Sequence, residues 1–203
     1  MTHEILRMHY LAGLITESEY KIKLEEESDP LMQAFKAGLN TLNSAPKKPS
    51  PKDGDLEEGL LTIPGLIASV PGMMKILGST VDGIANVIMT GKRKGNKKFK
   101  GTDFGGWLKK NGHKLEHFYI ESIGGWLKAT FPKKYKDQDV NDETSKLYDD
   151  ARKVYASILG AAAIEAGITA VKEIGTIIGS LEGGAAGIKT AEVIQLAKDI
   201  AKA

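Results

Sequence analysis

The chain has no cysteine, which excludes disulfides and thiolate metal sites. It also lacks an uninterrupted apolar run of the roughly 20 residues that a transmembrane helix requires. The longest uncharged apolar stretch, from Gly59 to Met74, is shorter than this and contains Pro64 and Pro71. The first twenty residues have no basic region, apolar segment and cleavage site of the kind found in signal peptides. We therefore expect a protein without a transmembrane span or signal peptide, cytoplasmic or packaged in a particle.

Nucleotide-binding and hydrolase motifs are absent as well. The sequence contains no Walker motif, no G-x-G-x-x-G and no nucleophile elbow. Acidic pairs such as Asp149–Asp150 are adjacent, so on a helix their carboxylates diverge instead of converging on a substrate. We expect no enzymatic activity, no cofactor and no small-molecule substrate.

The apolar residues recur at helical spacing throughout, and no segment shows the alternation of a strand. This pattern predicts an all-α protein with an N-terminal helical hairpin module, a flexible tether and a helical domain that ends in a C-terminal helical hairpin. The predicted divisions are residues 1–43 (hairpin module plus a third helix), 44–55 (a Pro- and Lys-rich linker), 56–136 (apolar helices and a basic-aromatic segment) and 137–203 (a Gly- and Ala-rich hairpin).

Two short helices are predicted at the N-terminus. The first covers residues 3–12 and stops at Gly13, a natural residue for the left-handed position after a helix. Thr16 and Glu19 form a capping box for the second, which runs to about residue 27. Ser28 or Asp29, with Pro30, then starts a third helix. We expect the apolar residues of the hairpin to meet between its two helices: Leu6, Leu11, Leu14, Ile15, Tyr20 and Leu24.

Residues 5–26 resemble the SHOCT motif, a short two-helix module. The positions that carry this resemblance are Leu6, Leu11, Gly13, Ile15, Thr16, Glu19, Tyr20 and Lys23. The motif covers about a tenth of the chain and implies oligomerisation or docking without catalysis. It is more often C-terminal in that family, whereas here it is N-terminal. The opening is also similar to that of small phage virion-associated proteins.

The most apolar stretch of the chain extends from Glu58 to Thr90. We predict a short helix beginning near Pro64 and a longer one from about Pro71 to Thr90. In the longer helix Lys75, Ser79, Asp82 and Asn86 form a polar stripe opposite the apolar residues. This pattern favours a helix packed on the protein's own core over one inserted into a membrane surface.

Residues 92–136 combine positive charge with aromatic rings. They contain thirteen Lys and Arg against three Asp and Glu, and most of the aromatic residues of the chain. GGWLK occurs twice, from Gly105 and from Gly124, and predicts two turn-plus-helix starts around a helix over residues 112–123. In such a segment lysines can bind phosphates while the aromatic rings stack on bases. The same composition suits a helix at the lipid headgroup region. It also fits a protein whose rings lie in the core and whose lysines lie on the solvated surface. The residues that we assign to an anionic-surface site are Lys92, Arg93, Lys94, Lys97, Lys98, Lys100, Trp107, Lys109, Lys110, Trp126 and Lys128.

A long helix is predicted from Asp142 or Thr144 to about residue 178, followed by an amphipathic helix over residues 185–203. Small residues at helical spacing in the long helix let another backbone approach closely, within the chain or from another subunit. The glycines assigned to this helix-packing interface are Gly160, Gly167, Gly175 and Gly179.

The motif H-K-L-E-H places His113 and His117 four residues apart on one helical face. Two such imidazoles could bind Zn²⁺ with Glu116 as a base and Glu192 as a third ligand, or with Glu121 in a non-catalytic site. The absence of strands argues against the mixed fold of zinc enzymes with this motif. We favour polar side chains on a solvated helix and predict no metal.

These observations lead to one hypothesis and two alternatives. We expect a non-enzymatic structural or assembly protein, associated with a virion, that self-associates or binds protein partners and docks its basic-aromatic segment on an anionic surface. The alternatives are a membrane-active helical protein, pore-forming or interfacial, and a non-specific nucleic-acid-binding protein.

Overall fold

The structure is a computed structural model that describes residues 3–45, 47, 62–90, 101–168 and 190–203. Every regular element in these ranges is a helix, so the predicted all-α class is confirmed. The helices are α1 (His3–Leu11), α2 (Glu17–Ser28), α3 (Pro30–Asn43), α4 (Ile63–Ala68), α5 (Met73–Thr90), α6 (Gly101–Thr130), α7 (Lys146–Glu165) and α9 (Thr190–Ile200).

The local signals at the helix ends act as predicted. Gly13 has φ +68° just after α1, and Thr16 and Glu19 form both hydrogen bonds of the capping box at the start of α2. Asp29 caps α3 by accepting a hydrogen bond from the Leu31 backbone N–H at 2.9 Å, with Pro30 in the first turn. These contacts span four residues or fewer, so the sequence alone predicts them.

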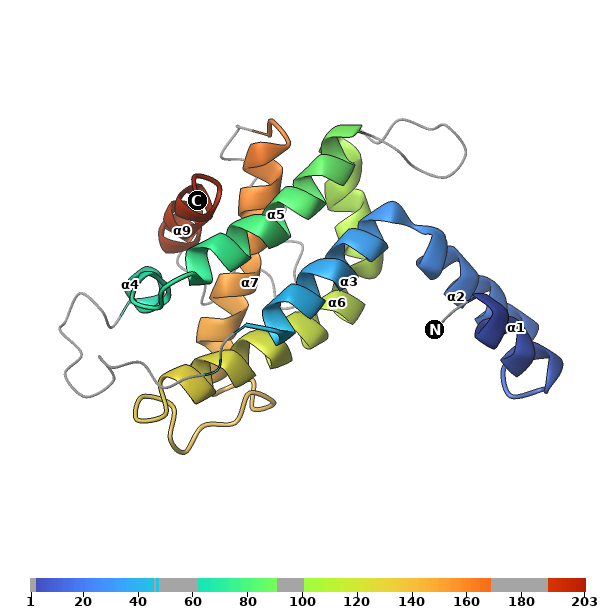
Figure 1. Cartoon of the computed structure of the whole chain (residues 1–203), viewed down its shortest axis with the longest axis horizontal. Helices are drawn as coiled ribbons and strands as arrows, with labels where there is room; N and C mark the ends of the chain where they lie inside the picture. Colours follow the sequence, from blue (N-terminus) through green and yellow to red (C-terminus); the bar gives the residue numbers. More distant parts are fainter. Residues whose placement is uncertain (1–2, 46, 48–61, 91–100, 169–189) are drawn as a thin grey trace.

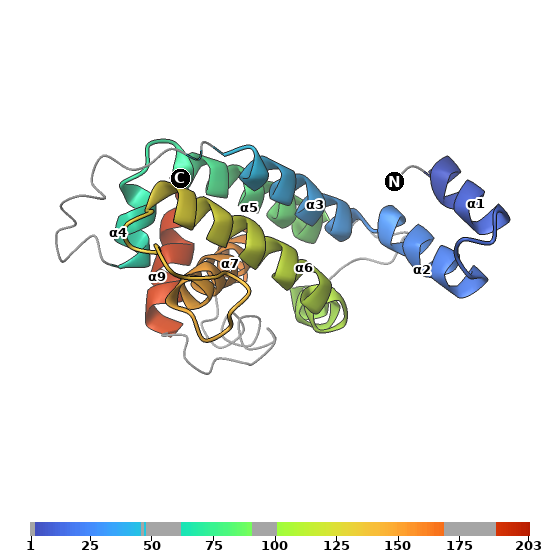
Figure 2. The same cartoon turned by 90° about the horizontal axis from the view of Figure 1, so that it is seen from below.

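Two parts of the molecule differ in how they are packed (Figure 1). Helices α3 to α9 surround one hydrophobic core and are called the body here. The hairpin of α1 and α2, residues 3–28, is called the arm; it extends away from the body beyond the N-terminal end of α3 (Figures 1 and 2). Within the arm α1 packs on α2, and α2 continues to α3.

Helix α7 lies at the centre of the body, where it packs against α5, α6 and α9. Its residues from Val154 to Ala163 are all buried, which its Ala- and Gly-rich sequence permits because small side chains let neighbouring helices come close. α5 packs on α3 and α7 with its apolar side, and its predicted polar stripe is exposed. The interpretation of residues 71–90 as a core helix agrees with this arrangement.

The body also includes α3, which the sequence analysis grouped with the N-terminal hairpin. Leu31, Phe35 and Leu42 of α3 belong to the same core as residues of α5, α6 and α7. The predicted divisions at residues 56–136 and 137–203 likewise share this single core. Packing therefore places the boundary between arm and body near Asp29, and only part of the linker predicted at 44–55 lies within the described residues.

The two GGWLK copies do not form turns. Both lie inside α6, a continuous helix of 30 residues, so the prediction of two separate helix starts is wrong. The structure also shows why glycine is present at one of these positions. A Cβ at Gly124 would overlap the side chain of Val140, which approaches α6 closely. Tertiary packing thus overrides the weak helix propensity of glycine.

The long helix predicted to reach residue 178 ends earlier. α7 stops at Glu165, and Gly167 has φ +86°. The Gly167 N–H donates to Ile164 O at 3.0 Å and the Ile168 N–H to Ala163 O at 2.9 Å, the two bonds of a Schellman motif. Gly167 therefore terminates a helix and does not pack one helix on another. The C-terminal helix α9 is also shorter than the predicted range of 185–203.

Candidate interaction surfaces

The two tryptophans are core residues, so their assignment to an anionic-surface site is wrong. Trp107 is 3% exposed and Trp126 is 2% exposed. The Trp107 ring stacks on Phe35 with centroids 5.5 Å apart, and its indole N–H donates to Asp29 Oδ2 at 2.7 Å. Trp126 packs edge-on against Phe131. Both indole rings contact other residues inside the protein, so they cannot stack on nucleic-acid bases or insert between lipid headgroups in this structure.

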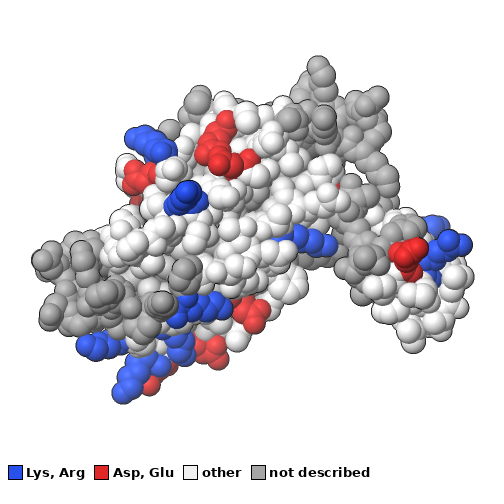
Figure 3. Space-filling view, in the orientation of Figure 1, with Lys and Arg blue, Asp and Glu red and all other residues white. Residues whose placement is uncertain are grey.

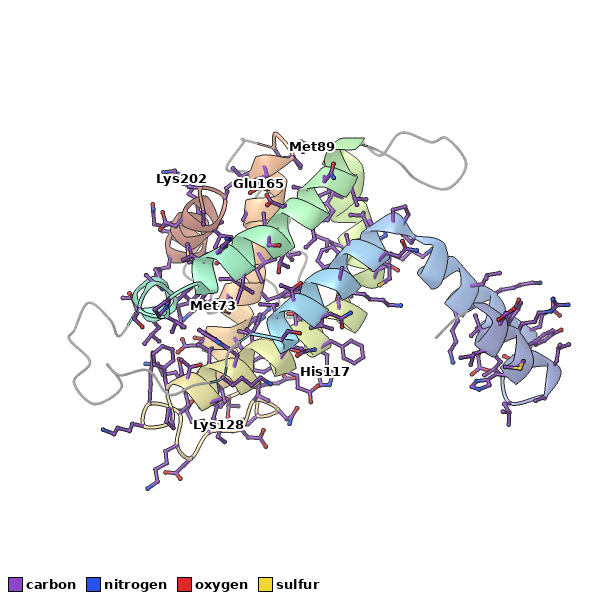
Figure 4. All side chains as sticks on the ribbon, viewed as in Figure 1. Met73, Met89, His117, Lys128, Glu165 and Lys202 are labelled. Atoms are coloured by element: carbon purple, nitrogen blue, oxygen red, sulfur yellow. The ribbon has the colours of Figure 1, made fainter. Side chains whose placement is uncertain are left out.

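The predicted lysines of this site divide into two groups. Lys109, Lys110 and Lys128 of α6 are exposed. The Lys128 ammonium donates to Gln138 O at 2.5 Å, so it holds the loop after α6 (Figure 4). On the face of the molecule that Figure 3 shows, Asp and Glu side chains lie between Lys and Arg side chains. The remaining cations of the set lie outside the described residues: Lys92, Arg93, Lys94, Lys97, Lys98 and Lys100.

The glycines assigned to a helix-packing interface also differ in their positions. Gly160 is buried at the centre of the body, where α7 packs within the chain. Gly167 is exposed at the end of α7. Gly175 and Gly179, the other half of the predicted interface, lie outside the described residues.

The body holds buried charged groups whose partners the sequence analysis did not predict. Glu116 pairs with Arg152 at 3.4 Å, and the Tyr135 hydroxyl donates to Asp150 Oδ2 at 2.8 Å. Lys134 lies 3.6 Å from the same carboxylate, and burial lowers its pKa, although Asp150 opposes that shift. Buried charges of this kind require partners. These contacts join α6 and the following loop to α7.

The H-K-L-E-H motif does not form a metal site in the described structure. Its Glu116 is 4% exposed and is paired with Arg152. His117 is exposed and points outward from α6, where it lines a pocket of about 180 Å³ with Glu121 and Glu143 (Figure 4). Across the described residues, no three His, Asp or Glu side chains are grouped so that they could hold an ion. The side chain of His113 lies outside the description.

A larger groove of about 510 Å³ lies beside this pocket, between α3, α6 and the loop that contains Val140. The apolar side chains that line it are Leu39, Val140 and Phe118, whose ring is 53% exposed. Lys47 and Glu121 carry the charges of its lining. The remaining lining residues are Asn43, Ser122 and Gly125.

The volume of this groove is within the range of about 300–1,000 Å³ that is usual for binding pockets. This feature depends on the packing of three segments, and the sequence analysis did not predict it.

The arm carries the other exposed apolar surface. Its large exposed side chains are Ile5 (39%), Met8 (59%), Leu11 (70%) and Leu14 (70%). Leu6 is fully buried, and the rings of Tyr10 and Tyr20 stack between the helices with centroids 5.0 Å apart. The expectation that Leu11 and Leu14 meet inside the hairpin is therefore wrong. Elsewhere in the described chain, Met89 and Phe118 are the exposed large hydrophobic side chains.

None of the helices in the described ranges has the length and apolar composition that crossing a bilayer requires. The resemblance of residues 5–26 to the SHOCT motif stays a prediction. Comparison of the chain with protein-family models, with curated proteins and with solved structures finds no match.

Proposed function

We propose that this chain is a non-enzymatic assembly protein that self-associates through its arm. The observation that carries the proposal is the concentration of exposed apolar side chains on the arm: four of the six large ones in the described structure. Large apolar side chains that are exposed together on one part of a protein are typical of an interaction site.

The size of the arm supports the same function. Helices of 9 and 12 residues are shorter than the roughly 12–15 residues at which isolated helices become even marginally stable in water. Among the arm side chains that the structure describes, Leu6 is the one fully buried hydrophobic residue. Packing of its outer face on another molecule supplies burial that the hairpin does not obtain by itself.

The alternatives of membrane insertion and nucleic-acid binding have less support. Both assigned a surface role to Trp107 and Trp126, whose side chains lie in the core. The lysines that remain available to either function are mostly in residues 92–100, outside the described structure.

Light scattering of the full chain tests the proposal. We expect the wild type to have a mass above the 21.9 kDa of one chain. The variant Met8→Glu/Leu11→Glu should have the mass of a single chain. Met89→Glu is the matched control, because Met89 is 60% exposed but belongs to α5, and it should leave the assembly unchanged. Circular dichroism should show that both variants keep the helical content of the wild type.

Two outcomes would overturn the proposal. One is a wild type that is monomeric at all accessible concentrations. The other is assembly that survives in Met8→Glu/Leu11→Glu.

A further inference from the structure

We infer that the arm of one molecule binds the α3–α6 groove of a second copy, so that the chain assembles head to tail. This inference rests on the proposed function and names the surface that the arm recognises. The arm exposes four large apolar side chains, and the groove, about 510 Å³ in volume, includes Leu39, Phe118 and Val140 among its lining residues. The two surfaces together account for five of the six exposed large hydrophobic side chains of the described structure.

An arm cannot reach the groove of its own molecule in this structure. The arm leaves the N-terminal end of α3, whereas Leu39, Asn43 and Lys47 of the groove lie toward the C-terminal end of that helix and beyond. Nine or more residues of helix, about 14 Å or more at 1.5 Å per residue, separate them. The arm also extends in the opposite direction (Figures 1 and 2).

The junction between arm and body is held by one side chain. Asp29 accepts hydrogen bonds from the Leu31 N–H at 2.9 Å and from the Trp107 indole at 2.7 Å, so it fixes the start of α3 to α6. Pro30 follows in the first turn of α3 and limits the backbone there. Folding the arm back would break these contacts, whereas a second molecule can bring its arm to the groove without any such change.

The charges of the two surfaces are compatible with this contact. Glu4 and Arg7 are exposed beside Ile5 and Met8 in α1, and Lys47 and Glu121 are exposed at the groove. Each surface therefore offers one acid and one base near its apolar part. The acid of each surface can therefore pair with the base of the other. Such pairing avoids placing like charges together in the interface, which would cost free energy.

A contact between two different surfaces has a consequence for assembly. Each molecule uses its arm once and its groove once, so molecules add until a ring closes or a chain grows. An arm-to-arm contact would instead pair identical surfaces and stop at a dimer. The two arrangements therefore predict different behaviour in a mixing experiment.

The experiment uses two full-length variants that each lack one surface. Met8→Glu/Leu11→Glu places two charges on the apolar surface of the arm. Phe118→Glu places one charge in the lining of the groove. The fold should tolerate this second substitution, because the Phe118 side chain is already half exposed. We expect each variant alone to be monomeric. Mixed in equal amounts, they should form a complex of two chains, because one intact arm then meets one intact groove.

The outcomes separate the two proposals. If Phe118→Glu assembles like the wild type while Met8→Glu/Leu11→Glu does not, the arm mediates assembly but the groove is not its partner. Two monomeric variants that fail to form a complex on mixing would also overturn the head-to-tail contact. Circular dichroism of both variants at the concentration used for light scattering verifies that each is folded.

Discussion

The body and the arm contain similar apolar residues and use them differently. In the body, leucines and isoleucines of α7 such as Ile158 and Leu159 are completely buried by the neighbouring helices. In the arm, Leu11 and Leu14 are 70% exposed. The difference indicates that the body is a complete folding unit, whereas the arm has more apolar surface than a two-helix hairpin can cover.

Their polar groups show the same contrast. The Glu116–Arg152 pair of the body is almost fully buried, and breaking a buried ion pair is usually strongly destabilising. The Lys21–Glu17 pair of the arm lies on one exposed helix face, where solvent screens the two charges, so it contributes little to stability. Specific buried contacts therefore hold the body together, whereas the ion pair of the arm is exposed to solvent.

The largest expected effect compares one substitution in the two regions. Leu159→Ala in α7 should lower the free energy of unfolding by about 2–5 kcal/mol because it leaves a cavity in a tightly packed core. Leu11→Ala in α1 should change it by less than about 0.5 kcal/mol, because the side chain is exposed in the single molecule. Thermal unfolding of dilute protein measures both, and equal losses for the two variants would contradict the division into body and arm.

A smaller effect should distinguish the two GGWLK copies, which have the same local sequence. Gly124→Ala should destabilise the protein by about 1–3 kcal/mol, because its methyl group would overlap Val140. At Gly105 no heavy atom of the described chain lies within 4 Å of an added Cβ. Gly105→Ala should therefore stabilise α6 by about 0.5–1 kcal/mol through its better helix propensity. Changes of the same sign in urea unfolding would contradict this role of packing.

The smallest expected effect depends on pH. Burial, together with the charge of Asp82 and a hydrogen bond to it, raises the pKa of Glu165 to about 7 from its usual 4.5. Because the folded-state pKa is raised, the stabilising contribution of this carboxyl is full below pH 4.5 and is lost as pH rises through 7. Glu165→Gln should remove this decline, which is about 1 kcal/mol once solvent screening is included.

Melting temperatures from pH 5 to pH 8 measure this difference. Asp82→Asn is the comparison variant, because it removes the neighbouring charge while burial, the largest cause of the raised pKa of Glu165, remains, and it should flatten the profile only in part. A wild-type profile that is the same as that of Glu165→Gln would contradict a raised pKa.

Local signals in the sequence predicted much of the helical framework. The capping box at Thr16, the cap at Asp29 and the stop at Gly13 depend on hydrogen bonds and backbone conformations within a few residues. The polar stripe of α5 was also predicted, because helical periodicity determines which residues share a face. Where a local signal was ambiguous, as at the glycine pairs of α6, the prediction failed.

The positions of side chains relative to the core were harder to predict. Trp107 donates to a carboxylate 78 residues away, and Tyr119 donates to Phe35 O at 2.6 Å across 84 residues. No pattern within α6 indicates these partners. Aromatic rings next to lysines fit both a core with a charged skin and an exposed binding surface, so only long-range packing distinguishes the two.

The sequence by itself determined the helical class, most of the described helix ends and the absence of cysteine chemistry, because each depends on composition or on contacts between near neighbours. Only the tertiary structure decided that both tryptophans are buried, that Leu11 and Leu14 are exposed and that α3, α6 and the Val140 loop enclose a groove. These features depend on how helices distant in the sequence pack together, and burial is a property of that whole arrangement.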